Sequence, residues 1–282
     1  MPNRRRVFSL ALADHEAVLV RSRLRPDRYE LRVDGVPQSI VSTSDPTALV
    51  YSYVRHIARA MDAAAPAGSP LFTVHLGAGA LTLPRYVAAT RTGSRQIVVE
   101  FEPALYAAVV AALPLPEQAD VRPVFGDARD VADAADEPDW SDAEFTVVDL
   151  WDAAVIRHRV ASREFYSRVA ARSAPGGIVA VNLLDGHPFT YSRRQAATLR
   201  TVFDHVAVVL DFDPDDEEGP LGNVLVFASD RPLDIAERPD LLGAPAPHLF
   251  SGDELTAWIG SSRIMTDADG TDSPDPDDPR WD

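Results

Sequence analysis

The first forty residues contain four short stretches in which apolar side chains dominate or alternate with polar ones. These stretches are residues 7–12, 17–21, 29–33 and 38–41. Asp34 and Gly35 separate the last two, and an Asp-Gly pair is typical of the tight turn of a β-hairpin. The pattern predicts a small N-terminal domain of β-strands over residues 1–45.

From Pro46 onward the hydrophobic spacing changes. Apolar residues between Leu49 and Met61 recur at helical spacing, which predicts an amphipathic helix. A segment rich in Ala, Pro and Gly follows over residues 63–70, and strand-like and helix-like stretches alternate after it. The predicted strands are 71–76, 96–100, 121–124, 145–150 and 178–184, and the predicted helices are 81–89, 103–113, 163–173 and 191–203.

Residues 205–210 and 223–228 resemble an antiparallel strand pair that closes this alternating series. Alternating β and α elements with apolar strands predict an α/β fold with a doubly wound sheet. We therefore expect one Rossmann-like domain over residues 46–262, with an antiparallel end.

The chain is acidic, with a formal net charge of −16 from 27 Lys and Arg against 43 Asp and Glu. Such a chain repels nucleic acid, so no nucleic-acid partner is expected. The acidity suits a cationic substrate or serves solubility alone. Residues 263–282 are rich in Asp and Pro, and this composition predicts a disordered acidic tail.

Several other classes of protein are excluded by missing features. The chain has no cysteine, and its histidines are scattered, so neither disulfides nor a metal site is predicted. No stretch approaches the roughly 18 apolar residues that span a bilayer, and the apolar start is too short for a signal peptide. We expect a cytoplasmic protein without a membrane partner. No G-x-S-x-G motif is present for serine-hydrolase chemistry.

A glycine-containing turn lies between the first predicted strand of the large domain and its helix. Gly77 and Gly79 allow a tight turn and close approach of a ligand to the main chain. The third glycine of the dinucleotide motif is missing, because position 82 is Thr82. This difference makes NAD a poor fit, since its pyrophosphate needs the full loop.

Two acidic positions follow the next two strands. In nucleotide-binding folds, a carboxylate about 20 residues after the glycines binds the ribose hydroxyls, and Glu100 lies near this spacing. Alternatively, Glu100 could be a solvated strand end. Asp127, followed by Ala128, could bind an adenine amino group or could cap a helix. Together with the glycine turn, these positions predict an adenosine pocket of the S-adenosylmethionine type at the carboxyl ends of consecutive strands.

The fourth predicted strand ends in Asp149, and Asp152 follows it three residues later. Two carboxylates on one loop could both face the cleft, where Asp149 could hold a cationic amine and accept its proton. The alternative is that both acids only solvate a loop.

Five phrases of the chain together resemble the spermidine synthase family of aminopropyltransferases, and closely an actinobacterial spermidine synthase-like branch. They are LRVDGVPQS (31–39), VHLGAGALTLPRY (74–86), GDAR (126–129), NLLDG (182–186) and GNVLVFA (222–228). The resemblance spans residues 29–230. It implies a β-stranded N-terminal domain, a Rossmann-like domain of the S-adenosylmethionine-dependent methyltransferase type, and a homodimer or tetramer.

The resemblance also implies a reaction. Decarboxylated S-adenosylmethionine, as a co-substrate and not a prosthetic group, would donate an aminopropyl group to a polyamine acceptor such as putrescine. By this resemblance Glu100 binds ribose, Asp127 and Ala128 bind adenine, and Asp149 accepts the proton. Asp152 is its partner carboxylate, and Tyr53 is a pocket tyrosine near the amines.

The chain departs from the family at four places. An acid of the family's glycine loop is replaced by Ala80, a glutamine by Val54, and a proline after the second acid by Ala153. A tyrosine expected just before Gly219 is absent. Aminopropyl transfer is the main prediction. Methyl transfer from S-adenosylmethionine and non-catalytic binding of an adenosyl compound or polyamine are the alternatives.

Overall fold

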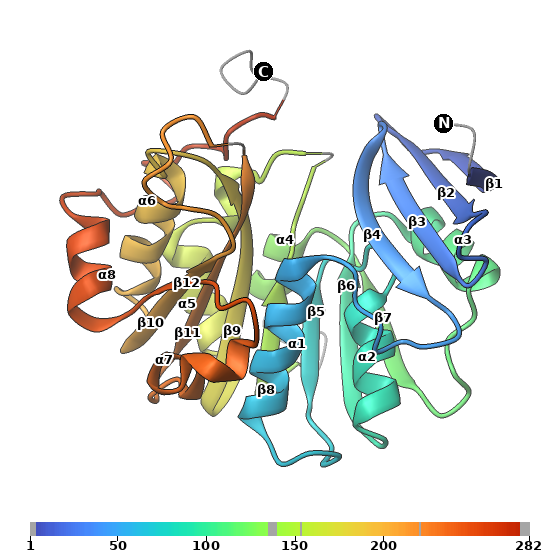
Figure 1. Cartoon of the computed structure of the whole chain (residues 1–282), viewed down its shortest axis with the longest axis horizontal. Coiled ribbons are helices and arrows are strands. Elements are labelled where there is room, and N and C mark those ends of the chain that lie inside the picture. The colour runs from blue at the N-terminus through green and yellow to red at the C-terminus, as the bar shows by residue number, and fades with distance from the viewer. Residues whose placement is uncertain (1–3, 135–139, 153, 220, 277–282) are drawn as a thin grey trace.

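The chain folds into a four-stranded sheet at its N-terminal end and a larger α/β unit (Figure 1). The structure is a computed structural model, and it describes residues 4–134, 140–152, 154–219 and 221–276. Ala153, which sequence comparison singles out, lies outside these residues.

The N-terminal sheet is antiparallel in the order β1-β2-β3-β4. Its strands are β1 (Arg4–Ala11), β2 (Glu16–Ser22), β3 (Arg28–Val33) and β4 (Val36–Ser42). Asp34 and Gly35 have φ angles of 49° and 82°, as the predicted hairpin turn requires. One face of the sheet buries Ala17, Leu19 and Leu31 against the region around α3 (Pro103–Ala112). The predicted N-terminal β-unit is therefore confirmed.

The larger unit is built on an eight-stranded sheet in the order β12-β10-β11-β9-β8-β5-β6-β7. The strands from β9 to β7 in this order are parallel, and β11, β10 and β12 are antiparallel to their neighbours. Their bounds are β5 (Thr73–Leu76), β6 (Arg95–Glu100), β7 (Asp120–Phe125), β8 (Ala143–Val148), β9 (Ser173–Asp185), β10 (His205–Leu210), β11 (Gly222–Ser229) and β12 (His248–Phe250).

Helices cover both faces of this sheet, because successive side chains of the buried strands point to opposite sides. Phe145 and Val147 pack with α1 (Ser52–Ala64) and α2 (Thr82–Thr90) on one face, while Val74 and Leu76 belong to the core of the other. The second face is covered by α4 (Ala128–Asp133), α5 (Arg163–Ala170), α6 (Thr190–Leu199) and α8 (Gly252–Ile259). Short helical turns complete the chain at η1 (His158–Val160), α7 (Asp234–Glu237) and η2 (Pro239–Leu242).

The doubly wound sheet with an antiparallel end is confirmed. The sequence prediction missed α4, α8 and β12, which are short and depend on packing against the sheet more than on their own periodicity. None of the helices among the described residues is long and apolar enough to cross a membrane.

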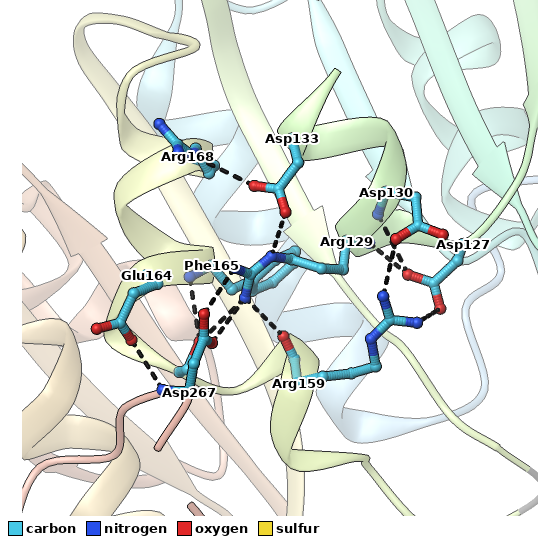
Figure 2. Close-up of polar contacts among 10 residues, drawn as sticks. Asp127, Arg129, Asp130, Asp133, Arg159, Glu164, Phe165, Arg168 and Asp267 are labelled. Carbon is cyan, nitrogen blue, oxygen red and sulfur yellow. Dashed lines mark hydrogen bonds and ion pairs between the residues drawn. The ribbon is translucent and has the colours of Figure 1, made fainter. Parts of the chain in front are cut away.

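The disordered tail predicted from residue 263 onward is wrong for residues 263–276, which pack along the molecule. Met265 is fully buried in the core. Asp267 accepts hydrogen bonds from both terminal nitrogens of Arg129, each at 2.8 Å, and the pKa of Asp267 is lowered to about 2 mainly by these bonds (Figure 2). Asp272 pairs with Arg157 at 3.0 Å. The acids of this segment are thus matched by distant arginines, which composition cannot reveal.

Replacing Arg129 by alanine should destabilise the fold, because its guanidinium joins α4 to the C-terminal segment and is only 14% exposed. Hydrogen bonds to charged groups of this kind contribute about 1.5–3 kcal/mol. Arg168→Ala is the control, since Arg168 is 62% exposed and shares the same partner, Asp133. It should change the free energy of unfolding by less than about 0.5 kcal/mol. Urea denaturation measures both; equal losses would contradict the assignment.

Candidate active site

The sheet reverses its winding at β5, which lies between β6 and β8. In open α/β sheets, ligands bind outside the carboxyl ends of the strands at such a point. A cavity of about 470 Å³ lies there, with walls from both the N-terminal sheet and the large sheet. Its lining includes Gly77, Glu100, Ala128, Asp149 and Tyr53, so the fold brings most of the predicted site residues together.

The glycine turn after β5 is held against the rest of the protein by close backbone contacts. Gly77 has a φ of 95°, and a Cβ atom there would lie 2.2 Å from the carbonyl oxygen of Asp149. Gly79 has a φ of 50°, and a Cβ atom there would lie 2.5 Å from Oγ of Ser39 in β4. The two glycines therefore let the turn fit between the end of β8 and the N-terminal sheet.

Glu100 ends β6 and supports the glycine turn from the other side. Its Oε2 accepts a hydrogen bond from the backbone amide of Ala78 at 3.1 Å, and its Oε1 accepts one from Glu102 at 2.9 Å. Burial raises the pKa of Glu100, while these backbone bonds lower it. The side chain is thus a fixed, cavity-lining carboxylate rather than a solvated strand end.

Asp149 is fixed by neutral donors only. Its Oδ1 accepts hydrogen bonds from Trp151 Nε1 at 2.6 Å and from Asn182 Nδ2 at 2.7 Å, and the hydroxyl of Tyr53 also hydrogen-bonds to it. Burial raises the pKa of Asp149, and the three hydrogen bonds act against that rise. A carboxylate has about four lone-pair positions, so one more donor can be accepted.

Sequence reasoning assigned no role to three of the residues around Asp149. Trp151 and Asn182 donate to it, and Asn223 Nδ2 donates to Asn182 Oδ1 at 3.1 Å, which orients the amide. Asn182 is 2% exposed and follows the apolar run of β9. A buried asparagine within such an apolar strand was the available signal, and only the folded structure shows its partner, Asn223, on β11.

Ala128 and Asp127, predicted together, lie in different environments. Ala128 lines the cavity. The Oδ1 of Asp127 caps α4 by accepting from the amides of Arg129 and Asp130, and its Oδ2 pairs with Arg159 at 2.9 Å (Figure 2). Both carboxylate oxygens are thus engaged, as the helix-cap alternative predicts, and adenine binding by Asp127 stays a prediction.

Asp152 is separated from Asp149, although a shared cleft was one prediction for the pair. Its Oδ1 is 3.0 Å from Nε2 of His15, and its Oδ2 accepts from Arg157 Nε at 2.7 Å. Burial raises the pKa of Asp152, but the bonds from His15 and Arg157 outweigh it and lower the pKa overall. Asp152 therefore links the loop after β8 to the N-terminal sheet and is not among the cavity-lining residues.

The described lining of the cavity contains acids but no arginine. Glu100 and Asp149 are the only acids among its described lining residues, and no Arg lies among them. His75 also lines the cavity, but burial lowers its pKa to about 4, which keeps it neutral at physiological pH. Within the described part of the chain, no group of three His, Asp or Glu residues could hold a metal ion.

This arrangement defines a class: a Rossmann-like sheet with the antiparallel end of S-adenosylmethionine-dependent methyltransferases. A crystal structure of a probable spermidine synthase from Corynebacterium glutamicum matches with a TM-score of 0.80 and 25% identity, over 92% of this chain and 96% of that one. A spermidine synthase in complex with the transition state analogue AdoDATO matches with a TM-score of 0.56 and 14% identity, over 91% and 84%.

Human methyltransferase-like protein 13 in complex with SAH matches less well, with a TM-score of 0.50 and 16% identity, over 77% of this chain and 92% of that one. No family model matches the sequence, and no curated protein matches it either. The chain is thus similar in fold to spermidine synthases, as the sequence resemblance predicts.

The close contact at Gly77 leads to a stability prediction. Gly77→Ala should destabilise the protein by about 1–3 kcal/mol more than Gly35→Ala does. Both substitutions strain the backbone at a positive φ, but only the Cβ atom at position 77 would also collide with the carbonyl of Asp149. Gly35 is a matched control, since its φ is 82° and a Cβ atom there meets nothing within 4 Å. Chemical denaturation compares the two variants, and equal losses would exclude the proposed contact.

Proposed function

We propose that this protein is an aminopropyltransferase that moves an aminopropyl group from decarboxylated S-adenosylmethionine to an amine. The observation that carries the proposal is Asp149, a partly buried carboxylate with raised pKa, held by three neutral donors and facing a cavity beside the glycine turn and Glu100.

The donor side of the site suits an adenosyl group. Glu100 would accept hydrogen bonds from the two ribose hydroxyls, and the backbone around Gly126 and Ala128 would contact adenine. Gly77 and Gly79 would bring main chain close to the nucleoside. The similarity in fold to a spermidine synthase solved in complex with the transition state analogue AdoDATO supports an adenosyl co-substrate.

The chemistry needs a base but no metal. The amine nitrogen attacks the methylene carbon beside the sulfonium, the C–S bond breaks as the N–C bond forms, and methylthioadenosine leaves as a neutral thioether. An alkylammonium has a pKa of about 10.4, as lysine does, so it must lose a proton before it can attack. Asp149 would accept that proton, and its raised pKa makes it a better base.

The absence of basic residues from the described cavity lining favours the decarboxylated donor over S-adenosylmethionine itself. A buried carboxylate on the ligand would lack a cationic partner there and would lie near two acids. Methyl transfer remains the second candidate, supported by the fold match to a methyltransferase-like protein. The third candidate is non-catalytic binding. It is favoured by Ala80, because the family carries an acid at this position that binds the ammonium of the donor. Ala80 is fully buried, and its amide donates a hydrogen bond to Ser39 Oγ at 3.1 Å.

Glu100→Ala should weaken the binding of methylthioadenosine, because the ribose hydroxyls lose a charged acceptor. The expected loss is about 1.5–3 kcal/mol, roughly a tenfold to hundredfold higher Kd in calorimetric titration. Glu102→Ala is the control, since Glu102 lies nearby on the chain but not among the cavity-lining residues. A melting curve shows that both variants are folded. Affinities within twofold of wild type for Glu100→Ala would refute the ribose assignment.

Asp149→Asn keeps the shape of the side chain and removes the base. Aminopropyl transfer in single-turnover assays should fall by about 10²–10⁴, while methylthioadenosine binding stays nearly unchanged. A variant that keeps more than a tenth of the wild-type rate would show that Asp149 is not the base.

The same base gives a pH dependence. The base acts only when ionised, so the rate should fall as the pH drops through the pKa of Asp149, which lies above the ordinary value. Asn182→Ala removes a hydrogen bond that favours the ionised form, and should move the acidic limb of kcat to still higher pH. An unmoved limb would argue against this role of Asn182.

A further inference from the structure

We infer that the acceptor is a monoamine with an apolar body, and not a diamine or longer polyamine. This inference rests on the proposed aminopropyl transfer and concerns the same cavity. The acids near the cavity are of two kinds: some are paired with cationic side chains of the protein, and others are not.

Asp149 and Asp152 differ in this respect. The hydrogen-bond partners of Asp149 are an indole, an amide and a phenol, none of which carries a positive charge. Asp152 is bonded through both oxygens to Arg157 and His15, and these bonds together with the charge of Asp152 raise the pKa of each partner. Asp152 therefore has cationic partners within the protein, while the hydrogen-bond partners of Asp149 are all uncharged.

The charges of the two reactants can be compared with the ionisable groups that line the cavity. The decarboxylated donor carries two positive charges, on the sulfonium and on the terminal ammonium. The described cavity lining offers two carboxyl groups, Glu100 and Asp149, and no arginine. A monoamine arrives as one ammonium and passes its proton to Asp149 as it attacks, so it adds one positive charge to the complex. A diamine adds a second ammonium at its far end, and a buried charge without a partner is strongly unfavourable.

The surfaces around Asp149 also suit an apolar body. Tyr53 and Tyr51 line the cavity with rings stacked 5.9 Å apart, and Trp151 lies beside the carboxylate to which it donates. Leu184 lies two residues beyond Asn182 on the same face of β9, and it also lines the cavity. Leu221 and Pro276 add further apolar lining. Where a second ammonium would need a carboxylate, these walls offer aliphatic and aromatic carbon.

The test compares matched amines that differ by one terminal amino group. Butylamine is compared with putrescine, and pentylamine with cadaverine, using the wild-type chain and the decarboxylated donor. The monoamine of each pair should have a kcat/KM at least tenfold higher, because only the diamine brings an unpaired charge into the cavity. A diamine that reacts as well as its monoamine, or better, overturns the inference.

Two variants test the cause of the preference. Leu184→Glu introduces a carboxylate into the cavity wall, and Leu184→Gln introduces a polar side chain of nearly the same size without the charge. The ratio of putrescine to butylamine turnover should rise at least tenfold in Leu184→Glu relative to Leu184→Gln. Equal ratios in the two folded variants would show that charge does not set the preference, and would overturn the inference.

The outcomes also separate this inference from the proposed function. Transfer to diamines alone refutes the monoamine acceptor and leaves aminopropyl transfer standing. No transfer to any of the four amines, with methylthioadenosine still bound in calorimetry, refutes both and leaves an adenosyl-binding protein.

Discussion

The site depends on how closely three stretches of backbone approach one another at the end of β5. The amide of Gly77 donates to the carbonyl of Val99 in β6, and the carbonyl of Leu76 accepts from the amide of Asp149 after β8, both at 2.9 Å. A side chain at Gly77 would collide with the carbonyl of Asp149. This packing fixes Glu100 and Asp149, at the ends of the two neighbouring strands, relative to the turn between them.

The N-terminal sheet is part of the same arrangement. Ser39 of β4 lies against Gly79 and accepts a hydrogen bond from the backbone amide of Ala80. The glycine turn therefore holds the N-terminal sheet, which forms one wall of the cavity, in place. His15, in the loop before β2, lies between Asp34 at 2.6 Å and Asp152 at 3.0 Å. The two units therefore share both the cavity and the polar contacts around it.

Pairing of charges decides which acids of this acidic chain can serve a ligand. Arg129 of α4 holds Asp267 of the C-terminal segment (Figure 2). Arg157, in the loop before η1, holds Asp272 of the same segment. Arg159 holds Asp127, and Arg157 holds Asp152. Asp149 differs from these acids because its partners are uncharged.

The sequence by itself determined the α/β architecture, because the periodicities of strands and helices are local. It also indicated the glycine turn, Glu100 and Asp149 as site residues, because they lie at the ends of apolar strands. Only the tertiary structure decided which neighbours each acid meets. Asp127 and Asp152 are acids that follow strands of the same sheet as the cavity acids, yet arginines near residue 158 bind both. The C-terminal segment is a second case in which local sequence did not predict the contacts. Its composition is that of a solvated tail, but Met265 is buried in the core, and Asp267 and Asp272 are held by partners more than a hundred residues earlier in the chain. Such long-range pairing depends on the folded path of the chain, which local patterns do not encode.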